Sequence, residues 1–233
     1  VKKILGGDHP GGGIPATLHA LSTRIGALKR TWLFAPVVTG IFSVGFGGSG
    51  GLEAPAVQAG ATIGSEIASR TKRNFRRRRL LIACAATASL SAMYKAPIAA
   101  LIFAVEVIMI DLTAASLVPL IFASLASLLT AYFLIEGEDI LSVTYLAPFA
   151  VKRLPFYILL GLLAGLGSVV FTRFYILSSR AVSRFKNPLT RIITAGLILG
   201  WSVASFPSLY GEGYEVVNSL FMGYSDIITS ELM

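Results

Sequence analysis

Four long stretches of this sequence contain no charged residue, and they limit what the chain can fold into. They are residues 31–52, 112–135, 154–172 and 192–211. Each is close to the ~20 residues with which an α-helix crosses the hydrocarbon core of a bilayer. Only 14% of all residues are charged, against about 25% in soluble domains. The sequence therefore predicts an all-α integral membrane protein with four full-length spans in a lipid bilayer.

Shorter apolar runs lie between these stretches, at residues 54–65, 80–94, 96–105 and 216–225. They are too short to cross a bilayer alone, which is typical of the half-helices and tilted helices from which transporters build substrate sites. From both kinds of run together we expect helices near residues 14–23, 26–44, 53–70, 74–94, 97–107, 112–135, 152–186 and 190–207.

One carboxylate, that of Glu53, lies inside residues 31–65, which are otherwise uncharged. An ionisable group at membrane depth is energetically costly and normally marks an ion or proton pathway. Directly before it, GFGGSGG at residues 45–51 is too glycine-rich to continue a helix, so we expect an unwound loop buried within the membrane. A second glycine–proline motif, GGGIP at residues 11–15, precedes another predicted helix. Two helices thus begin beside glycine-rich segments.

A helix N-terminus presents unpaired backbone N–H groups and about half a positive charge. Two such ends aimed at one point would attract an anion without a charged side chain, and would dehydrate it without trapping it. The Glu53 carboxylate can take the anion's place and leave it on protonation, which links anion passage to pH. The alternative is that Glu53 only favours the helix N-terminus, an effect worth at most about 2 kcal/mol.

Basic residues are concentrated in one short part of the chain, and the net charge is +8. These residues are Arg70, Lys72, Arg73, Arg76, Arg77, Arg78 and Arg79. Because Phe75 is the only aromatic residue among them, the pattern does not favour nucleic-acid binding. It indicates a positive-inside loop on the cytoplasmic side, near anionic lipid headgroups.

Other residue types indicate no metal and no cofactor. Cys84 is the only cysteine, which excludes an internal disulfide and a thiolate metal site. His9 and His19 lie too far apart, and have too few acidic residues nearby, to suggest a metal centre. The chain shows no signal peptide and begins without Met, so we expect it to be part of a longer protein.

Three motifs resemble those of the CLC family of chloride channels and proton-coupled chloride transporters. GLEAPAVQAG at residues 51–60 resembles GxEGPxVQxG, with Glu53 at the position of the gating glutamate. GGGIP at residues 11–15 resembles GSGIP, and YKAPIAALIFAVE at residues 94–106 resembles FNAPLAGxLFxxE. The resemblance implies a homodimer in the cell membrane, with one chloride pore per subunit, two inverted halves per subunit and voltage-gated chloride channel activity.

The resemblance also implies how the chain is divided. Residues 1–135 would be the first-half pore helices with the anion-site motifs, residues 136–151 a loop, and residues 152–233 the start of the second half. The dimer surface would lie on the helices within residues 97–135. The anion would be bound near Gly12, Gly13, Ile14, Leu52 and Ala54.

The chain departs from the family pattern at three positions that affect function. Gly12 replaces the serine that contacts the central anion, which leaves chloride, nitrate and fluoride open. Val107, directly after Glu106, stands where the exchangers have their inner proton-transfer glutamate, and valine carries no proton. Lys95 replaces an asparagine and either extends to the membrane interface or lines the anion path. We expect a channel or a weakly proton-coupled transporter, with H+/Cl- exchange as the alternative.

Two further readings are open. GFGGSG at residues 45–50 fits the dinucleotide-binding pattern GxGxxG. That pattern requires a preceding strand, whereas an apolar run of helical length precedes it here, so we predict that the chain is not an enzyme. A structural membrane subunit without a pore would explain the apolar stretches but not Glu53 in its glycine-rich setting.

Overall fold

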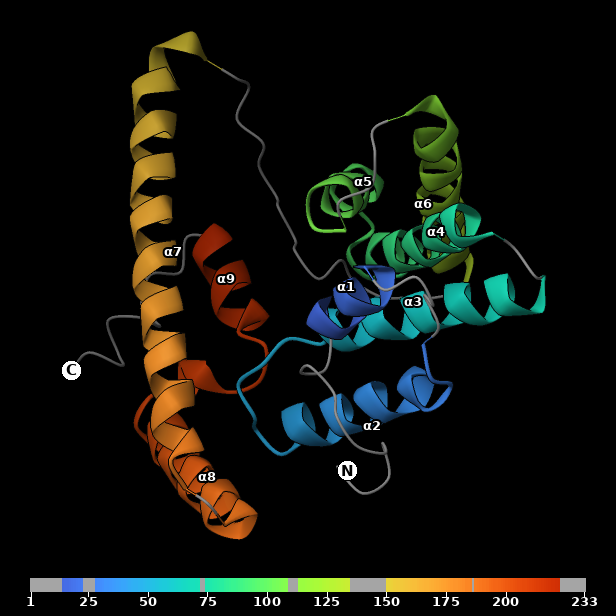
Figure 1. The fold of residues 1–233 in the computed structure, drawn as a ribbon. Coiled ribbons are helices and arrows are strands. Elements are labelled where there is room, and N and C mark those ends of the chain that lie inside the picture. The colour runs from blue at the N-terminus through green and yellow to red at the C-terminus, as the bar shows by residue number, and fades with distance from the viewer. Residues whose placement is uncertain are drawn as a thin grey trace. The chain divides into compact units, whose positions relative to one another are not determined.

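The described part of the chain is entirely helical and irregular, with no strand. The computed structural model describes residues 14–22, 28–71, 74–108, 113–134, 150–185 and 187–222. The α-helices are α1 (Ile14–Ser22), α2 (Thr31–Gly45), α3 (Glu53–Arg70), α4 (Phe75–Tyr94), α5 (Pro97–Glu106), α6 (Ala114–Leu134), α7 (Leu154–Ser183), α8 (Pro188–Ser205) and α9 (Tyr214–Phe221) (Figure 1). Two short 3-10 helices, η1 (Val151–Arg153) and η2 (Pro207–Leu209), complete the order. The prediction of an all-α fold is confirmed.

The chain divides into two compact units. The first contains residues 1–142 together with 210–218, and the second contains residues 143–209 together with 219–233. The first unit thus takes in a segment that follows α8 in sequence. The predicted three-part division at residues 135 and 151 stays a prediction, and most of its loop, residues 136–149, lies outside the described residues.

The centre of the first unit is the contact between α3 and α4, which lie side by side (Figure 1). Glycines allow the two backbones to approach closely. A Cβ atom at Gly64 would lie 2.8 Å from the Cα atom of Ile82, and one at Gly60 would lie 2.6 Å from the carbonyl oxygen of Ala85. Small residues at helix contacts are the usual means of packing helices in membranes. The two helices therefore meet backbone to backbone.

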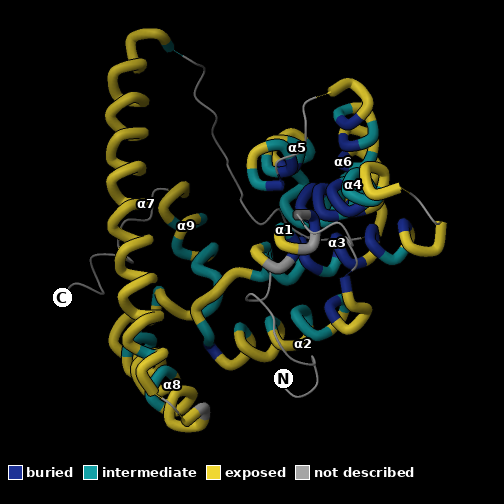
Figure 2. Tube along the Cα trace, in the orientation of Figure 1, coloured by how far each residue is buried: buried dark blue, intermediate teal, exposed yellow. Residues whose placement is uncertain are grey.

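The core of the first unit runs along α3 and α4 (Figure 2), and it combines large apolar residues such as Ile82 and Leu120 with many small and hydroxyl-bearing ones. Its hydroxyl groups bond to backbone carbonyls, so no water is needed to satisfy them. Thr62 donates to Gln58 (2.7 Å), and Thr87 donates to Ala83 (2.8 Å), both within their own helices. Ser91 of α4 donates to the carbonyl oxygen of Ser124 in α6 (2.6 Å) and ties these two helices together.

Ion pairs join the start of α2 to the end of α3. Both guanidinium donors of Arg30 reach the Glu66 carboxylate, at 2.6 and 3.1 Å, and Arg70 donates to the same carboxylate at 2.9 Å. The groups are exposed, so each pair contributes little to stability on its own. Nearby, the backbone N–H of Leu28 donates to the buried hydroxyl of Ser65 at 3.0 Å.

The break between α4 and α5 is where the sequence predicts it. Lys95 has φ of 51°, in the left-handed region that ends a helix. Pro97 begins α5, since a proline is accepted in the first turn. Only a short irregular link therefore separates α5 from α4.

The second unit contains α7 and α8, and neither has a buried residue among those whose burial is described (Figure 2). Two stretches of the described chain, Ala114–Leu134 and Val151–Ser183, are long and apolar enough to cross a bilayer. The prediction of four full-length spans is therefore wrong for residues 31–52 and 192–211, because α2 ends at Gly45 and α8 ends at Ser205. A run without charges can include a loop, and both of these runs do.

We predict that Gly64→Ala lowers the stability of the protein by about 1–3 kcal/mol, because the new methyl group meets the α4 backbone and forces the helices apart. The measurement is thermal unfolding in detergent. Gly45→Ala is the matched control, since nothing lies within 4 Å of a Cβ atom there, and we expect it to be neutral or slightly stabilising. Equal melting temperatures for the two variants would contradict the close packing of α3 on α4.

Candidate functional site

The starts of three helices of the first unit line one cavity of about 250 Å³. Ile14 is the first residue of α1, Glu53 the first residue of α3, and Ala96 directly precedes α5. The remaining lining residues are Val57, Leu90, Tyr94, Ala99, Ala100 and Phe103. The predicted convergence of the two glycine–proline motifs is therefore observed for Ile14 and Glu53, while Gly12 and Gly13 lie outside the described residues.

The electrostatics of this cavity favour negative charge. Each helix start contributes partial positive charge from backbone N–H groups. The rest of the wall is apolar apart from Tyr94 and Glu53. Glu53 is half-buried, and an ionised carboxylate there gains from the α3 N-terminus. The same field would favour a bound anion in its place.

The Glu53 carboxylate is held by two tyrosine hydroxyls. Tyr94, the last residue of α4, donates to Oε1 of Glu53 at 2.6 Å. Tyr214, the first residue of α9, donates to the same oxygen at 2.5 Å. The two tyrosine rings meet edge to face, with centroids 6.4 Å apart. The carboxylate is therefore fixed by donors from two segments that are remote in sequence.

Gly51 leaves the space that the carboxylate occupies. A Cβ atom at this position would overlap Oε2 of Glu53 and would lie 2.9 Å from Oε1. The Glu53 side chain is thus folded back toward the loop that precedes α3. Alanine at position 51 would displace it.

That loop is irregular from Phe46 to Leu52, as the sequence predicts. Within the chain Gly47 is buried under Tyr210, and its neighbours are exposed or half-buried. The prediction that the loop lies within the membrane stays a prediction. The element before it is the helix α2 and not a strand. The structural setting that a dinucleotide-binding motif requires is therefore missing at this GxGxxG sequence.

The same loop is tied to the segment that follows α8. The N–H of Gly50 donates to the carbonyl oxygen of Gly211 at 3.2 Å, and the N–H of Leu52 donates to Oε1 of Glu212 at 3.0 Å. The Leu52 amide, which the sequence assigns to the anion together with that of Ala54, is thus occupied by a second carboxylate. Two acidic side chains meet at the N-terminus of α3.

Two glycines determine the backbone course of the segment that follows α8. Gly211 and Gly213 have φ of +70° and +78°, values that glycine adopts without strain. The resulting turn directs Glu212 to the Leu52 amide and Tyr214 to the Glu53 carboxylate.

The other predicted site residues do not line this cavity. The Lys95 ammonium lies 5.2 Å from the centre of the Tyr132 ring of α6, a cation–π arrangement. Glu106 ends α5, about 5 Å along the helix beyond Phe103, the last residue of α5 in the cavity wall. Val107 follows Glu106. The structure therefore does not bring Lys95, Glu106 or Val107 to the cavity wall beside Glu53.

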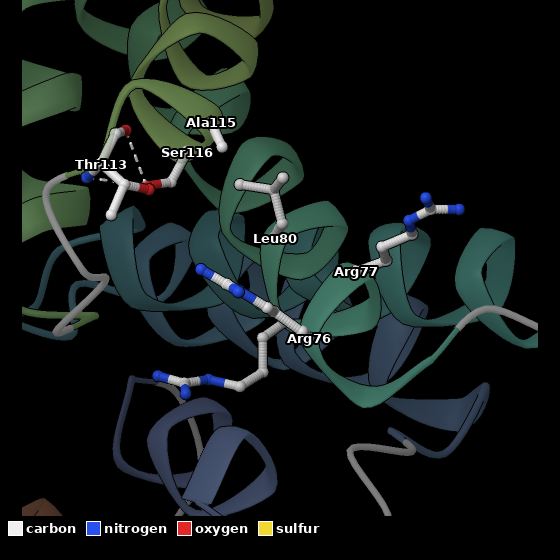
Figure 3. Close-up of a pocket in the computed structure, with 7 residues that line it drawn as sticks. Arg76, Arg77, Leu80, Thr113, Ala115 and Ser116 are labelled. Atoms are coloured by element: carbon white, nitrogen blue, oxygen red, sulfur yellow. Dashed lines mark hydrogen bonds between the residues drawn. The ribbon is translucent and has the colours of Figure 1, made fainter.

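A second pocket, of about 270 Å³, lies between the start of α4 and the start of α6 (Figure 3). It is lined by Arg76, Arg77, Arg79, Leu80, Thr113, Ala115 and Ser116. The hydroxyls of Thr113 and Ser116 bond to each other (2.8 Å) and close the first turn of α6. Arg77 extends away from them in Figure 3. The pocket belongs to the basic cluster of the sequence, and it is separate from the cavity at Glu53.

Reasoning from sequence missed Tyr94, Glu212 and Tyr214 as site residues. Tyr94 carried one signal, because it stands where the motif that it resembles has phenylalanine. Glu212 and Tyr214 carried none, since they lie 160 and 161 residues from their partners Leu52 and Glu53.

Comparison with known proteins identifies the family. The family model described as voltage gated chloride channel matches residues 1–232. A ClcB-like protein of Ralstonia nicotianae is 30% identical over 215 residues, which are 86% of this chain and 48% of that protein. The voltage-gated ClC-type chloride channel ClcB of Citrobacter koseri is 30% identical over 146 residues, which are 62% of this chain and 35% of that protein.

A solved structure supports the same family assignment. The crystal structure of a slow cyanobacterial Cl-/H+ antiporter matches with a TM-score of 0.73 and 25% identity, over 90% of this chain and 50% of that chain. The chain thus spans half the length of these relatives or less. With its all-α fold and three motifs in order, the chain belongs to the voltage-gated chloride channel (CLC) family.

Proposed function

We propose that this chain forms part of a pathway that carries monovalent anions across a membrane, with chloride as the foremost substrate and Glu53 as the gate. The observation that carries the proposal is the cavity at which Glu53, Ile14 and Ala96 meet at three helix starts. Helix N-termini attract an anion without binding it as tightly as a cationic side chain would. The ionised carboxylate competes for the same partial charge. Protonation neutralises the carboxylate. The neutral side chain no longer competes for the helix N-termini, and the anion can bind there.

A second candidate is coupled H+/Cl- exchange, which is favoured by the likeness to a Cl-/H+ antiporter structure. Coupling requires a proton path from Glu53 to the opposite side of the membrane. Val107 has no titratable group, and Glu106 lies at the far end of α5. We therefore propose a channel or a weakly coupled transporter. Nitrate and fluoride are alternative anions, because Gly12 supplies no hydroxyl.

The assembly that we propose is a homodimer in the cell membrane. The surfaces of α5 and α6 expose large apolar side chains, among them Ile98, Ile102, Phe122, Leu125 and Leu129. A contiguous apolar surface fits a partner subunit or lipid. In this arrangement residues 1–135 form first-half pore helices, and residues 152–233 begin the second half.

The gate is tested by anion efflux from liposomes that contain the full-length protein. We expect wild-type efflux to rise as the pH falls, because protonation releases Glu53. Glu53→Gln and Glu53→Ala should make efflux independent of pH, or abolish it, since neither side chain titrates. Glu66→Gln is the control, because Glu66 lies near the other end of α3 and pairs with arginines. A Glu53→Gln variant that keeps the wild-type pH profile would contradict the gate.

Proton coupling is tested separately. With a chloride gradient as the only driving force, we expect little or no uphill proton movement across the liposome membrane, because Val107 cannot relay a proton. The measurement is the internal pH reported by a dye. Stoichiometric proton movement would instead favour the exchanger.

The basic cluster gives a prediction about orientation. We expect its arginines to face the cytoplasm, beside anionic headgroups. Asn74 is exposed next to them, so Asn74→Cys in a background without other cysteines should react with a membrane-impermeant maleimide only from the cytoplasmic side. Inverted and right-side-out vesicles provide the comparison. Labelling from the external side alone would reverse the proposed orientation.

A further inference from the structure

We infer that Tyr94 and Tyr214 are positioning residues that hold the ionised Glu53 carboxylate and release it on protonation. The inference rests on the proposed function, in which Glu53 is the gate. It adds to the gate a hydroxyl latch, defined as the side chains of Tyr94 and Tyr214.

The geometry of the latch is that of a closed oxygen cluster. Both hydroxyls donate to Oε1 of Glu53, at 2.6 Å from Tyr94 and 2.5 Å from Tyr214. The two hydroxyl oxygens are 2.6 Å from each other, but each hydroxyl has only one proton, so no hydrogen bond joins them while both donate to Glu53. Since the rings also meet edge to face, neither hydroxyl can move far from the carboxylate without disturbing the other tyrosine.

The chemistry of these bonds depends on the charge of the carboxylate. A hydrogen bond to an ionised acceptor is roughly twice as strong as a neutral one. The latch therefore stabilises Glu53 mainly while it is charged. A proton on Glu53 weakens both bonds together, so that the side chain is freed by the same event that removes its charge.

Few other polar groups of the described residues face Glu53. The start of α3 contributes its backbone N–H groups, and Glu212 lies on the Leu52 amide beside it. From α1 and α5 the cavity wall receives Ile14, Ala96, Ala99, Ala100 and Phe103, and none of these titrates. The helix α2 packs on the start of α3 and contains no charged residue. The two phenols are therefore the side-chain donors on which the charged form depends.

The backbone conformation next to each latch residue fixes the position of that residue. Tyr94 precedes Lys95, whose left-handed conformation ends α4 at this point. Tyr214 follows the turn at Gly211 and Gly213, and that turn is bonded to the loop before α3.

The test compares the pH dependence of anion efflux for Tyr94→Phe, Tyr214→Phe and the wild type, using the full-length protein in liposomes with chloride as the anion. Loss of a hydroxyl that favours the charged carboxylate makes protonation easier. We expect the pH of half-maximal efflux to move up by about one unit for each variant, and further for the double variant. Efflux at neutral pH should rise accordingly.

Tyr210→Phe is the matched control, because it removes a hydroxyl from the same segment and Tyr210 lies against Gly47 instead. Its pH profile should match that of the wild type. Thermal unfolding of each variant checks that the protein is folded. The same tyrosine substitutions are then made in Glu53→Gln, where they should change nothing, because no charge remains to be held.

The outcomes separate the latch from the gate. If Glu53→Gln removes the pH dependence but both phenylalanine variants keep the wild-type midpoint, the latch is wrong and the gate stands. If the tyrosine substitutions act equally in the Glu53→Gln background, they do not act through the carboxylate, and the latch is again overturned. If Glu53→Gln itself titrates like the wild type, the proposed function fails first.

Discussion

The structure of the first unit depends on how one carboxylate is kept in a largely apolar wall. Glu53 is compensated by the N-terminus of its own helix and by two phenolic hydroxyls. Among the described residues, no cationic side chain lines its cavity. Dipoles and hydroxyls stabilise a negative charge without neutralising it permanently, which is the condition for a site that must exchange its occupant.

Glycines make this arrangement possible at three places: the contact of two helices, the space beside the carboxylate, and a turn. Gly60 and Gly64 bring the backbones of α3 and α4 into contact. Gly51 leaves space for the carboxylate beside the start of α3. Gly211 and Gly213 make the turn that returns a distant segment to the same place. A side chain at Gly51, Gly60 or Gly64 would collide with its neighbour, whereas at Gly211 or Gly213 it would strain the backbone of the turn.

Much of this arrangement could be predicted from the sequence. The position of Glu53 in a charge-free stretch, and the glycine–proline motifs around it, located the cavity, and the sequence Lys95-Ala96-Pro97 located the break before α5. These signals are local, since they depend on propensity and on the energetics of burying charge. The charge-free runs 31–52 and 192–211 extend past the ends of α2 and α8, because an uncharged loop and an uncharged helix look alike in composition.

The pairing of remote segments could not be predicted in the same way. Nothing near Tyr214 in the sequence shows that its hydroxyl reaches a carboxylate 161 residues earlier. Nor does the sequence show that Glu212 caps α3 at Leu52. Such contacts are decided by the tertiary fold, and a single sequence without an alignment carries no record of them.

The backbone contact at Gly60 and Gly64 also determines what can move. At Gly64 the nearest atoms of α4 are all backbone atoms, so helix α3 can slide or turn against α4 there only by separating two backbones. Under the proposed gate, opening is then a rotation about the single bonds of one side chain, an event of picoseconds to nanoseconds where the side chain is free. In such a gate the time between openings is governed by proton delivery. Its opening rate therefore depends on the pH of the solution and not on a movement of the helices.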